Sequence, residues 1–411
     1  MNRDLATAGR MRTSALLALG AAAIVACIVY APQQAFEASL EGLKIWWHIV
    51  FPALLPFLVL TEMLIALGII HGIGTLLTPL MRSLFRLPGS AGFVLPLGAV
   101  VGFPSGAAAA AKLHQRGQLP SSEAARLAAL SHFCNPMLII IVISAGFLHQ
   151  PAVGSLLLIV HLLAGLGAGF IYSRMGRGAR NKAAEAEVPE QPHAVAANRS
   201  QVSLFKQAYR SMEQARRLDG RSFGKLLGDA VSEAVQTLMT VGGFMLIFAV
   251  VIQILSRAFP SGFPAYILPG LLEVHLGTYA IVQQGITSPA LQAALLSAVL
   301  GWGGLCSYFQ VRAVLKPAGL QIRGFLFTRL LHGAIAYVLT LLIWKQFNSW
   351  FPQLTAVSTD SGAEGSLSPV FLFPNGSQSM ELLVWQSGLL AVVIAGLVLF
   401  SLIWKHRRSE H

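Results

Sequence analysis

The chain alternates long apolar stretches with short polar stretches that carry most of its basic residues. An apolar stretch of roughly 17–25 residues is long enough to cross the hydrocarbon core of a bilayer as a helix. Such stretches, taken as the predicted transmembrane helices, are 13–30, 45–70, 127–148, 151–172, 235–255, 265–284, 325–344 and 381–404. The pattern therefore predicts an all-α integral membrane protein with about eight transmembrane helices.

Two further apolar stretches, 89–111 and 288–310, contain breaks that a spanning helix should not have. The first holds the run Gly102, Phe103, Pro104, Ser105 and Gly106, followed by five alanines, and the second holds Gly301-Trp302-Gly303-Gly304. Broken backbone at membrane depth is tolerated only where protein or a water-filled cavity satisfies its polar groups. If each stretch enters and returns on the same side, the basic residues that flank it stay on that side. We therefore predict two re-entrant helical hairpins with tips at these runs.

Composition supports the membrane class, because the 411 residues are 55% hydrophobic, only 11% are charged, and the mean hydropathy is +0.65. The net charge of +12 could suggest nucleic acid, but the basic residues flank apolar stretches as the positive-inside rule expects. We expect no nucleic-acid partner. Cys27, Cys134 and Cys306 each lie in an apolar stretch and form no metal-ligand spacing, so neither a disulfide nor a metal site is predicted.

The polar stretches divide the chain into five predicted segments. Residues 1–44 form an anchor helix, interpreted as uncleaved, and an interfacial segment; 45–172 form a first repeat; 173–222 form a basic cytoplasmic linker; 223–346 form a second repeat; and 347–411 form an external loop and a C-terminal helix. In the second half of the linker, apolar residues at near-helical spacing predict a basic amphipathic surface helix.

The two halves resemble one another. Gly102–Gly106 aligns with the run beginning at Gly301 at an offset of 199 residues, and a helix precedes each run. Paired, interrupted apolar segments in matching halves indicate the binding site of a transporter. The charge pattern places both hairpins on one side, whereas inverted repeats would place them on opposite sides. The sequence leaves this conflict open.

Glu62 and Glu273 are the acids that we place well inside predicted spans. An ionisable residue at membrane depth is costly unless it is paired, neutral or faces a cavity, so each is a candidate for proton or substrate coupling. A structural hydrogen bond to a broken helix is the alternative for Glu62. Asn135, just before Pro136, interrupts a predicted span and leaves a carbonyl that either contacts substrate or marks a plain kink.

At the predicted tips, short helices would direct free N–H groups into the membrane interior, where they favour anions. Helix packing by small residues is the alternative explanation for this composition. The predicted substrate-binding residues are Glu62, Gly102, Phe103, Pro104, Ser105, Gly106, Asn135, Glu273, Gly301, Gly303, Gly304, Ser307 and Gln310. No nucleotide-binding, hydrolase or metalloprotease motif occurs in the sequence, so we predict neither an enzyme nor a cofactor.

These motifs carry a family resemblance. The run 42–57, the Gly102–Gly106 break with its alanines, Cys134-Asn135-Pro136, the run 270–277 and Gly301–Gly304 together resemble the YlbJ family of sporulation integral membrane proteins, whose nucleoside-recognition (Gate) domains would form the two repeats. The resemblance covers roughly residues 13–345. It implies a role in endospore formation and the movement of dipicolinic acid across the outer forespore membrane of the mother cell.

Three functions remain open at this point. The first is a transporter of a small organic anion, with dipicolinic acid as the substrate that the resemblance implies. The second is a nucleoside or nucleobase permease. The third is a non-transporting scaffold in the bacterial cell membrane, with other sporulation membrane proteins as partners and residues 173–222 as the docking surface.

Overall fold

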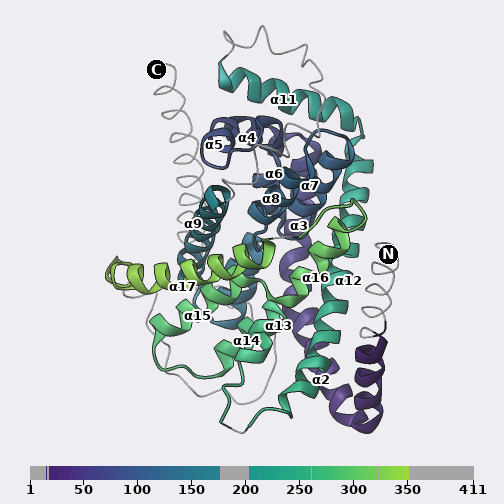
Figure 1. The fold of residues 1–411 in the computed structure, drawn as a ribbon, viewed down its shortest axis with the longest axis vertical. Coiled ribbons are helices and arrows are strands. Elements are labelled where there is room, and N and C mark those ends of the chain that lie inside the picture. The colour runs from purple at the N-terminus through teal and green to yellow at the C-terminus, as the bar shows by residue number, and fades with distance from the viewer. Residues whose placement is uncertain (1–14, 16–17, 176–202, 261, 323, 351–411) are drawn as a thin grey trace, which may run out of the picture.

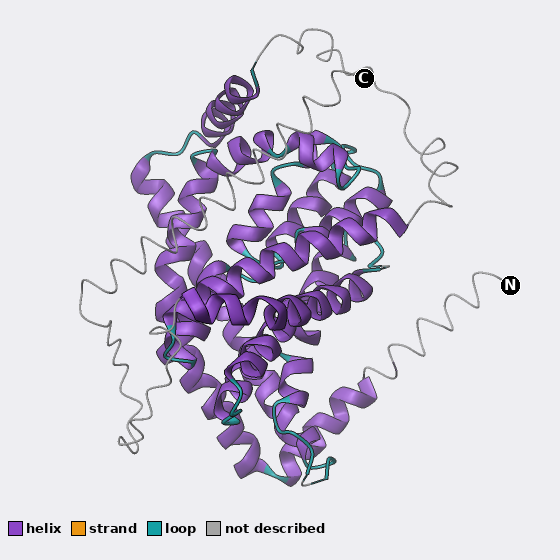
Figure 2. Ribbon diagram, turned by 90° about the vertical axis from the view of Figure 1, so that its left-hand side faces the viewer, coloured by secondary structure: helices purple, strands orange, loops and turns teal. Residues whose placement is uncertain are grey.

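The computed structural model describes residues 15, 18–175, 203–260, 262–322 and 324–350. Within these residues every regular element is helical (Figures 1 and 2). The predicted C-terminal helix at 381–404, the loop before it and the first half of the linker lie outside the described residues. The described part confirms the all-α class.

Five helical stretches in the described residues are long and apolar enough to cross a membrane. They are Pro32–Ala66, Pro151–Met175, Phe223–Ser256, Pro289–Leu315 and Phe325–Trp350. This confirms the integral membrane class, while the total number of spans stays a prediction.

The first long stretch is a single helix. It consists of α2 (Pro32–Ile45), the π-helical turn η1 (Trp46–Val50) and α3 (Phe51–Ala66). A separate interfacial segment and a span that begins near residue 45 were expected instead. Pro52 lacks the amide that would continue the α-helical bonding pattern, and the wider π turn immediately before it lets the helix continue.

The first predicted hairpin is present as a helical hairpin. Short helices α4 (Ile69–Leu76), α5 (Thr78–Ser83) and η2 (Gly89–Ala91) lead to α6 (Val94–Val101) and α7 (Ser105–Gln115). The two arms pack against each other. At the tip, Gly102 has a φ of 91°, a conformation that favours glycine, and the Phe103–Pro104 peptide bond is cis.

An interrupted helix follows the first hairpin. It runs through α8 (Ser121–Leu130), an irregular segment at 131–135 and the π-helical η3 (Leu138–Phe147). The interruption falls at Asn135-Pro136, as the sequence predicts. The chain then returns through the long helix α9 (Pro151–Met175).

The second half begins with α11 (Leu204–Asp219) and α12 (Phe223–Ser256). The next segment was predicted to be one span at 265–284, and this prediction is wrong. It forms α13 (Ile267–Leu272) and α14 (Val274–Gln283), which fold back on one another at the extended residue Glu273. A Cβ atom on Gly277 would lie only 2.8 Å from the backbone nitrogen of Gly270, so two glycines permit this close contact.

The prediction of a second hairpin with its tip at Gly301–Gly304 is also wrong. There α15 (Pro289–Trp302) stops at Gly303, with a φ of 80°, and α16 (Gly304–Leu315) follows. Instead of folding back on α15, α16 packs on α7 and α13. This stretch is an interrupted helix within a candidate span, and α17 (Phe325–Trp350) comes after it.

The described elements therefore occur twice in one order: a long helix, a hairpin, an interrupted helix and another long helix. Equivalent helices pack across the halves, α12 on α2 and α3, and α17 on α9. The true counterpart of the Gly102–Pro104 tip is Glu273, and the counterpart of Gly303 is the irregular segment 131–135. The alignment at an offset of 199 residues matched a hairpin with an interrupted helix. The boundaries of the five segments stay a prediction.

The two hairpins approach the centre from opposite ends of the molecule. The open end of the α6–α7 hairpin lies by α4, on which α11 packs. Helix α12 starts beside α11 and runs for 34 residues, about 50 Å, to the loop that leads into α13. Figure 1 shows α11 and α4 at the top and α13 and α14 in the lower half. The same-side arrangement favoured by the charge pattern is thus wrong, and the halves are inverted.

Candidate functional site

Each hairpin tip packs on the interrupted helix of its own half. At the first tip, the Phe103 amide donates a hydrogen bond to the Phe133 carbonyl at 3.0 Å. A Cβ atom on Gly102 would lie 3.0 Å from the backbone nitrogen of Asn135. At the second tip, a Cβ atom on Gly304 would lie 2.8 Å from the carbonyl oxygen of Leu272. The glycines allow both contacts.

The two helix interruptions also contact each other. A Cβ atom on Gly303 would lie 3.2 Å from Nε2 of His132. The Cys134 thiol donates to the Leu300 carbonyl at 3.4 Å, which ties the segment 131–135 to the last turn of α15. Two tips and two interruptions therefore meet in one central junction of the described residues. Gly102, Asn135, Glu273, Gly303 and Gly304, predicted from the sequence, are brought together here.

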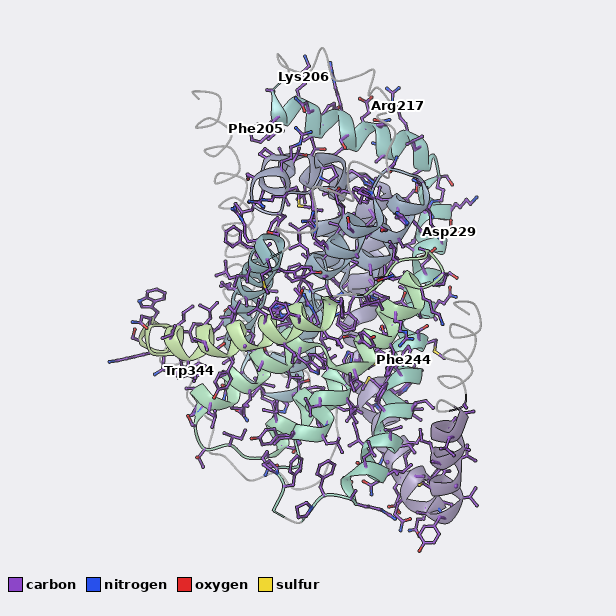
Figure 3. All side chains as sticks on the ribbon, viewed as in Figure 1. Phe205, Lys206, Arg217, Asp229, Phe244 and Trp344 are labelled. Carbon is purple, nitrogen blue, oxygen red and sulfur yellow. The ribbon has the colours of Figure 1, made fainter. Side chains whose placement is uncertain are left out.

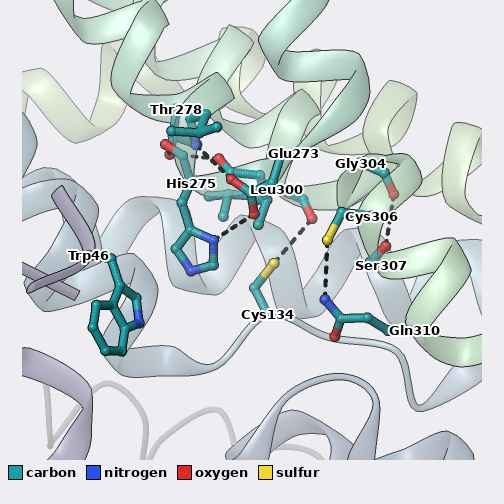
Figure 4. A network of polar contacts seen from close by, with 12 residues as sticks. Trp46, Cys134, Glu273, His275, Thr278, Leu300, Gly304, Cys306, Ser307 and Gln310 are labelled. Atoms are coloured by element: carbon teal, nitrogen blue, oxygen red, sulfur yellow. Dashed lines mark hydrogen bonds and ion pairs between the residues drawn. The ribbon is translucent and has the colours of Figure 1, made fainter. Parts of the chain in front are cut away.

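Glu273 forms a buried pair with His275 at the second tip (Figure 4). Its Oε1 lies 2.7 Å from Nδ1 of His275, and its Oε2 accepts the Leu276 amide at 2.8 Å. The carboxylate thus caps the first turn of α14 and neutralises the positive end of that helix. Both oxygens have partners within the hairpin, so the residue positions the tip whatever further role it has.

The other predicted residues of the second half divide between junction and packing. Gln310 donates from Nε2 to the Cys306 thiol at 3.2 Å, and the buried Ser307 hydroxyl donates to the Gly304 carbonyl at 3.0 Å (Figure 4). Gly301 lies elsewhere, because a Cβ atom there would be 2.7 Å from the Gly333 nitrogen on α17. Gly301 therefore permits close packing of α15 on α17.

In the first half, Gly106 has a similar packing position. A Cβ atom on Gly106 would lie 2.8 Å from the carbonyl oxygen of Ser131, at the end of α8. Asn135 holds two segments together: its Oδ1 accepts the Met137 amide at 2.7 Å, and its Nδ2 donates to the Val101 carbonyl at 3.2 Å. The amide thus links the interruption to the arm of the hairpin.

A buried arginine beside the junction was missed by the sequence analysis. Arg329 on α17 is 1% exposed. Its guanidinium donates to the carbonyls of His132 at 2.6 Å and Ala129 at 2.8 Å, and it lies 3.1 Å from Nδ1 of His332. These carbonyls belong to the end of α8 and the interruption, where no helical amide can reach them. Arg329 therefore holds the interruption in place.

Two histidines extend this network. His161 on α9 accepts the Cys134 amide at Nε2, 2.9 Å away, and its own carbonyl lies 2.8 Å from Nε2 of His332. The ring of His132 stacks on Phe103 with centroids 4.7 Å apart. Among the described residues no carboxylate pairs with Arg329. The guanidinium therefore places a positive charge beside the junction, partnered by backbone carbonyls instead of a carboxylate.

A cavity of about 420 Å³ lies beside the first hairpin. Its polar lining comes from α3, α4, α7 and α12, and comprises Glu62, His71, Ser105, Lys112, Arg116 and Glu233. Glu62 and Ser105 therefore face this cavity. Val101 also lines it, and the Val101 carbonyl bonds Asn135, so the cavity adjoins the junction.

Glu233 was another residue that the sequence analysis did not select. The predicted span began at residue 235, whereas α12 begins at Phe223. A signal was present, because Glu233 lies within the long apolar helix that the repeat places opposite Glu62 on α3.

Comparison with known proteins adds to this geometry. Residues 47–148 match the Gate family, described as nucleoside recognition. The chain is 34% identical over 346 residues to the sporulation integral membrane protein YlbJ of Bacillus subtilis (strain 168), which covers 80% of this chain and 82% of that protein. The chain belongs to the YlbJ family. No solved structure matches it.

In this YlbJ-family chain the Gate match has a clear structural meaning. It starts in η1, includes the first hairpin and ends just after η3. The matched region therefore contains one hairpin tip and one helix interruption, which is half of the central junction. The other half is supplied by α13 to α16.

Proposed function

We propose that this chain is a membrane transporter of a small organic anion, and that dipicolinic acid is its substrate during endospore formation. The observation that carries the proposal is the meeting of two opposed hairpin tips with two helix interruptions. Transporters with inverted repeats place substrate at such a junction, where interrupted helices expose backbone groups. Opposed hairpins also provide one movable element for each side of the membrane.

The cations of the region suit an anion, although Glu62 and Glu233 place two carboxylates in the same cavity lining. Dipicolinate is a flat aromatic ring with two carboxylates. Lys112 and Arg116 line the cavity, the N-terminus of α7 begins at Ser105 beside it, and Arg329 lies behind the junction. A cavity of about 420 Å³ is in the range of small-molecule sites. In the proposed cycle, substrate enters this cavity and passes the first tip when the hairpin moves.

Uptake of labelled dipicolinate into membrane vesicles that carry the protein tests the proposal. We expect uptake by the wild type and a loss of at least tenfold in Ser105→Leu, because a larger apolar side chain fills the cavity beside the tip. Glu62→Gln tests whether Glu62 couples transport to protons, because loss of the carboxyl group should alter the dependence of uptake on a proton gradient. Arg257→Gln, which changes an exposed cation just after the end of α12, is the control. A folded wild type without uptake would contradict the proposal.

A nucleoside permease is the second candidate, and specific observations favour it. The Gate family is described as nucleoside recognition. The cavity also carries two carboxylates, Glu62 and Glu233, which could accept hydrogen bonds from sugar hydroxyls. His71 and Phe93, which line it too, stack with centroids 4.9 Å apart. Uptake of labelled uridine that is inhibited by unlabelled uridine, but not by unlabelled dipicolinate, would favour this candidate.

The location and the scaffold alternative are tested separately. We propose that the chain acts in the outer forespore membrane, which a fluorescent fusion observed during sporulation would check. If deletion of residues 180–215 abolished spore formation while the Ser105→Leu variant remained fully functional, the scaffold function would replace transport.

A further inference from the structure

Helix α11 is a basic, amphipathic helix at one end of the molecule. Three residues, 220–222, join it to α12, which is long and apolar enough to span the membrane. Phe223 and Leu227 are exposed at the start of α12, and the charged residues Lys225 and Asp229 lie beside them. Such a mixture of apolar and charged side chains suits the level of lipid headgroups, and α11 lies directly next to it.

One face of α11 is occupied by the protein itself. Leu204 and Ala208 are buried, and Met212 packs over α4, where a Cβ atom on Gly72 would lie 2.7 Å from the sulfur of Met212. The hydroxyl of Ser211 also donates to the His71 carbonyl at 3.5 Å. These contacts fix the helix against α4 and determine which side chains remain outside.

The outer surface of α11 combines aromatic rings with cations. Phe205 is 63% exposed and Tyr209 is 66% exposed, and their spacing of four places them on the same side of the helix. Lys206 follows Phe205 and Arg210 follows Tyr209, and both cations are also exposed. Figure 3 shows Phe205, Lys206 and Arg217 on the outer part of α11. Such a pairing of ring and cation is typical of helices that lie at a membrane surface.

The cations of α11 differ in whether the protein already neutralises them. Arg217 pairs with Glu213 at 2.5 Å, and Arg221 pairs with Asp219 at 2.7 Å and Asp229 at 3.0 Å. Within the described residues, Lys206, Arg210 and Arg216 enter no ion pair. Arg216 is also exposed. This leaves three exposed cations on α11 that the described residues do not neutralise.

We propose that the outer surface of α11, formed by Phe205, Lys206, Tyr209, Arg210 and Arg216, binds the headgroups of anionic phospholipids. The three cations meet the phosphate groups, and the two rings lie at the boundary with the acyl chains. The joint to a membrane-spanning helix and the exposed rings favour lipid over an acidic soluble protein. The inference does not depend on the transported substrate.

Native mass spectrometry of the full chain, released from detergent, tests this with phosphatidylglycerol and phosphatidylcholine as the lipids. We expect the wild type to prefer phosphatidylglycerol, and added salt to reduce that preference. The triple variant Lys206→Gln/Arg210→Gln/Arg216→Gln should lose roughly 5-fold in phosphatidylglycerol affinity per cation. Phe205→Ser/Tyr209→Ser should weaken binding without changing its salt dependence.

The matched control is Arg257→Gln/Arg312→Gln/Lys345→Gln, which removes the same charge from exposed sites outside α11. This control should keep the wild-type lipid preference within about twofold, because salt screens the effect of charges that lie far from the outer surface of α11. Equal losses in the two triple variants would overturn the proposal, and so would a wild type that does not distinguish the lipids. An acidic protein that co-purifies with the wild type but not with the α11 triple variant, with phosphatidylglycerol affinity unchanged, would also overturn it.

Discussion

Single residues decide how the interrupted helices are held. In the α8–η3 interruption, carbonyls that a continuous helix would satisfy are bonded by the Arg329 guanidinium, and the Cys134 amide is bonded by His161. In the second half, the Glu273 carboxylate caps α14. Interruptions at this depth persist because side chains replace the missing backbone partners.

Of these three side chains, sequence analysis located Glu273 and missed Arg329 and His161. Glu273 was found because a carboxylate in the middle of an apolar run is rare. Arg329 lies near the start of the predicted span 325–344 and was not selected, because Arg312, Lys316 and Arg323 precede it closely and it resembles one more flanking cation. The only signal against this was its place five residues into an apolar run, with His332 one turn further on the same helix face.

The stability of the Arg329 variants tests its structural role. Arg329→Met should lower the free energy of unfolding by about 1–3 kcal/mol for each carbonyl left without a donor. Arg329→Lys should recover only part of the lost free energy of unfolding, because an ammonium group cannot reach both carbonyls with the fixed geometry of a guanidinium. Thermal unfolding in detergent measures the effect, with the exposed Arg312→Met as control. If Arg329→Met unfolded at the wild-type temperature, Arg329 would not hold the interruption.

At the scale of elements, hydropathy predicted the long helices and the first hairpin but confused the second hairpin with a span. The run 265–284 has the length of a span, and its turn at Glu273 is made by one extended residue without proline. The run 288–310 contains the glycines expected of a tip, yet it continues as α16. Composition marks where a helix is interrupted, but packing decides whether the chain turns back.

The joint between α11 and α12 gives a prediction for pH. Hydrogen bonds from Arg221 hold the pKa of Asp219 below its ordinary value of 3.8. Because the pKa of Asp219 is lower in the folded state, its ion pair stabilises the joint at pH values above 3.8. This stabilisation is lost as the pH falls below 3.8 and through the folded-state pKa. Asp219→Asn should remove the effect at neutral pH, at a cost of less than about 1 kcal/mol because the pair is partly exposed.

Hydrogen exchange of the α11 amides measures this effect. Exchange should be faster in Asp219→Asn than in the wild type at pH 7, and the difference should shrink as the pH falls below 3.8. Glu213→Gln, which breaks the exposed pair with Arg217 within α11, serves as the control and should leave the joint unchanged. Equal exchange of Asp219→Asn and wild type at pH 7 would show that the pair does not fix the joint.

At the scale of the whole molecule, the charge rule led to a path that differs from the path in the structure, although both paths place most basic clusters on one side. The sequence predicts a span followed by a hairpin, whereas the structure has a hairpin followed by a span. Either order leaves the chain on the same side of the membrane afterwards. Arg312 and Lys316 therefore fall on the side of Arg116 in both arrangements. The residues between the two elements, such as Gln284, change sides, and they carry no cluster of charges that would reveal it.

Cysteine labelling distinguishes the two paths. After replacement of Cys27, Cys134 and Cys306, single cysteines at Arg116, Gln284 and Lys316 are exposed to a membrane-impermeant reagent from each side. The structure predicts that positions 116 and 316 react from one side and position 284 from the other. Reaction of all three from one side would restore the sequence-based path and contradict the opposed hairpins.

The central claim is that a small dicarboxylate passes between the two hairpin tips. Counterflow in liposomes that contain the purified full chain tests it most directly, because exchange needs no knowledge of the coupling ion. Liposomes preloaded with unlabelled dipicolinate should accumulate labelled dipicolinate transiently, and Ser105→Leu should abolish this. If preloaded liposomes with folded wild-type protein accumulated no more labelled dipicolinate than preloaded liposomes without the protein, the account would be contradicted.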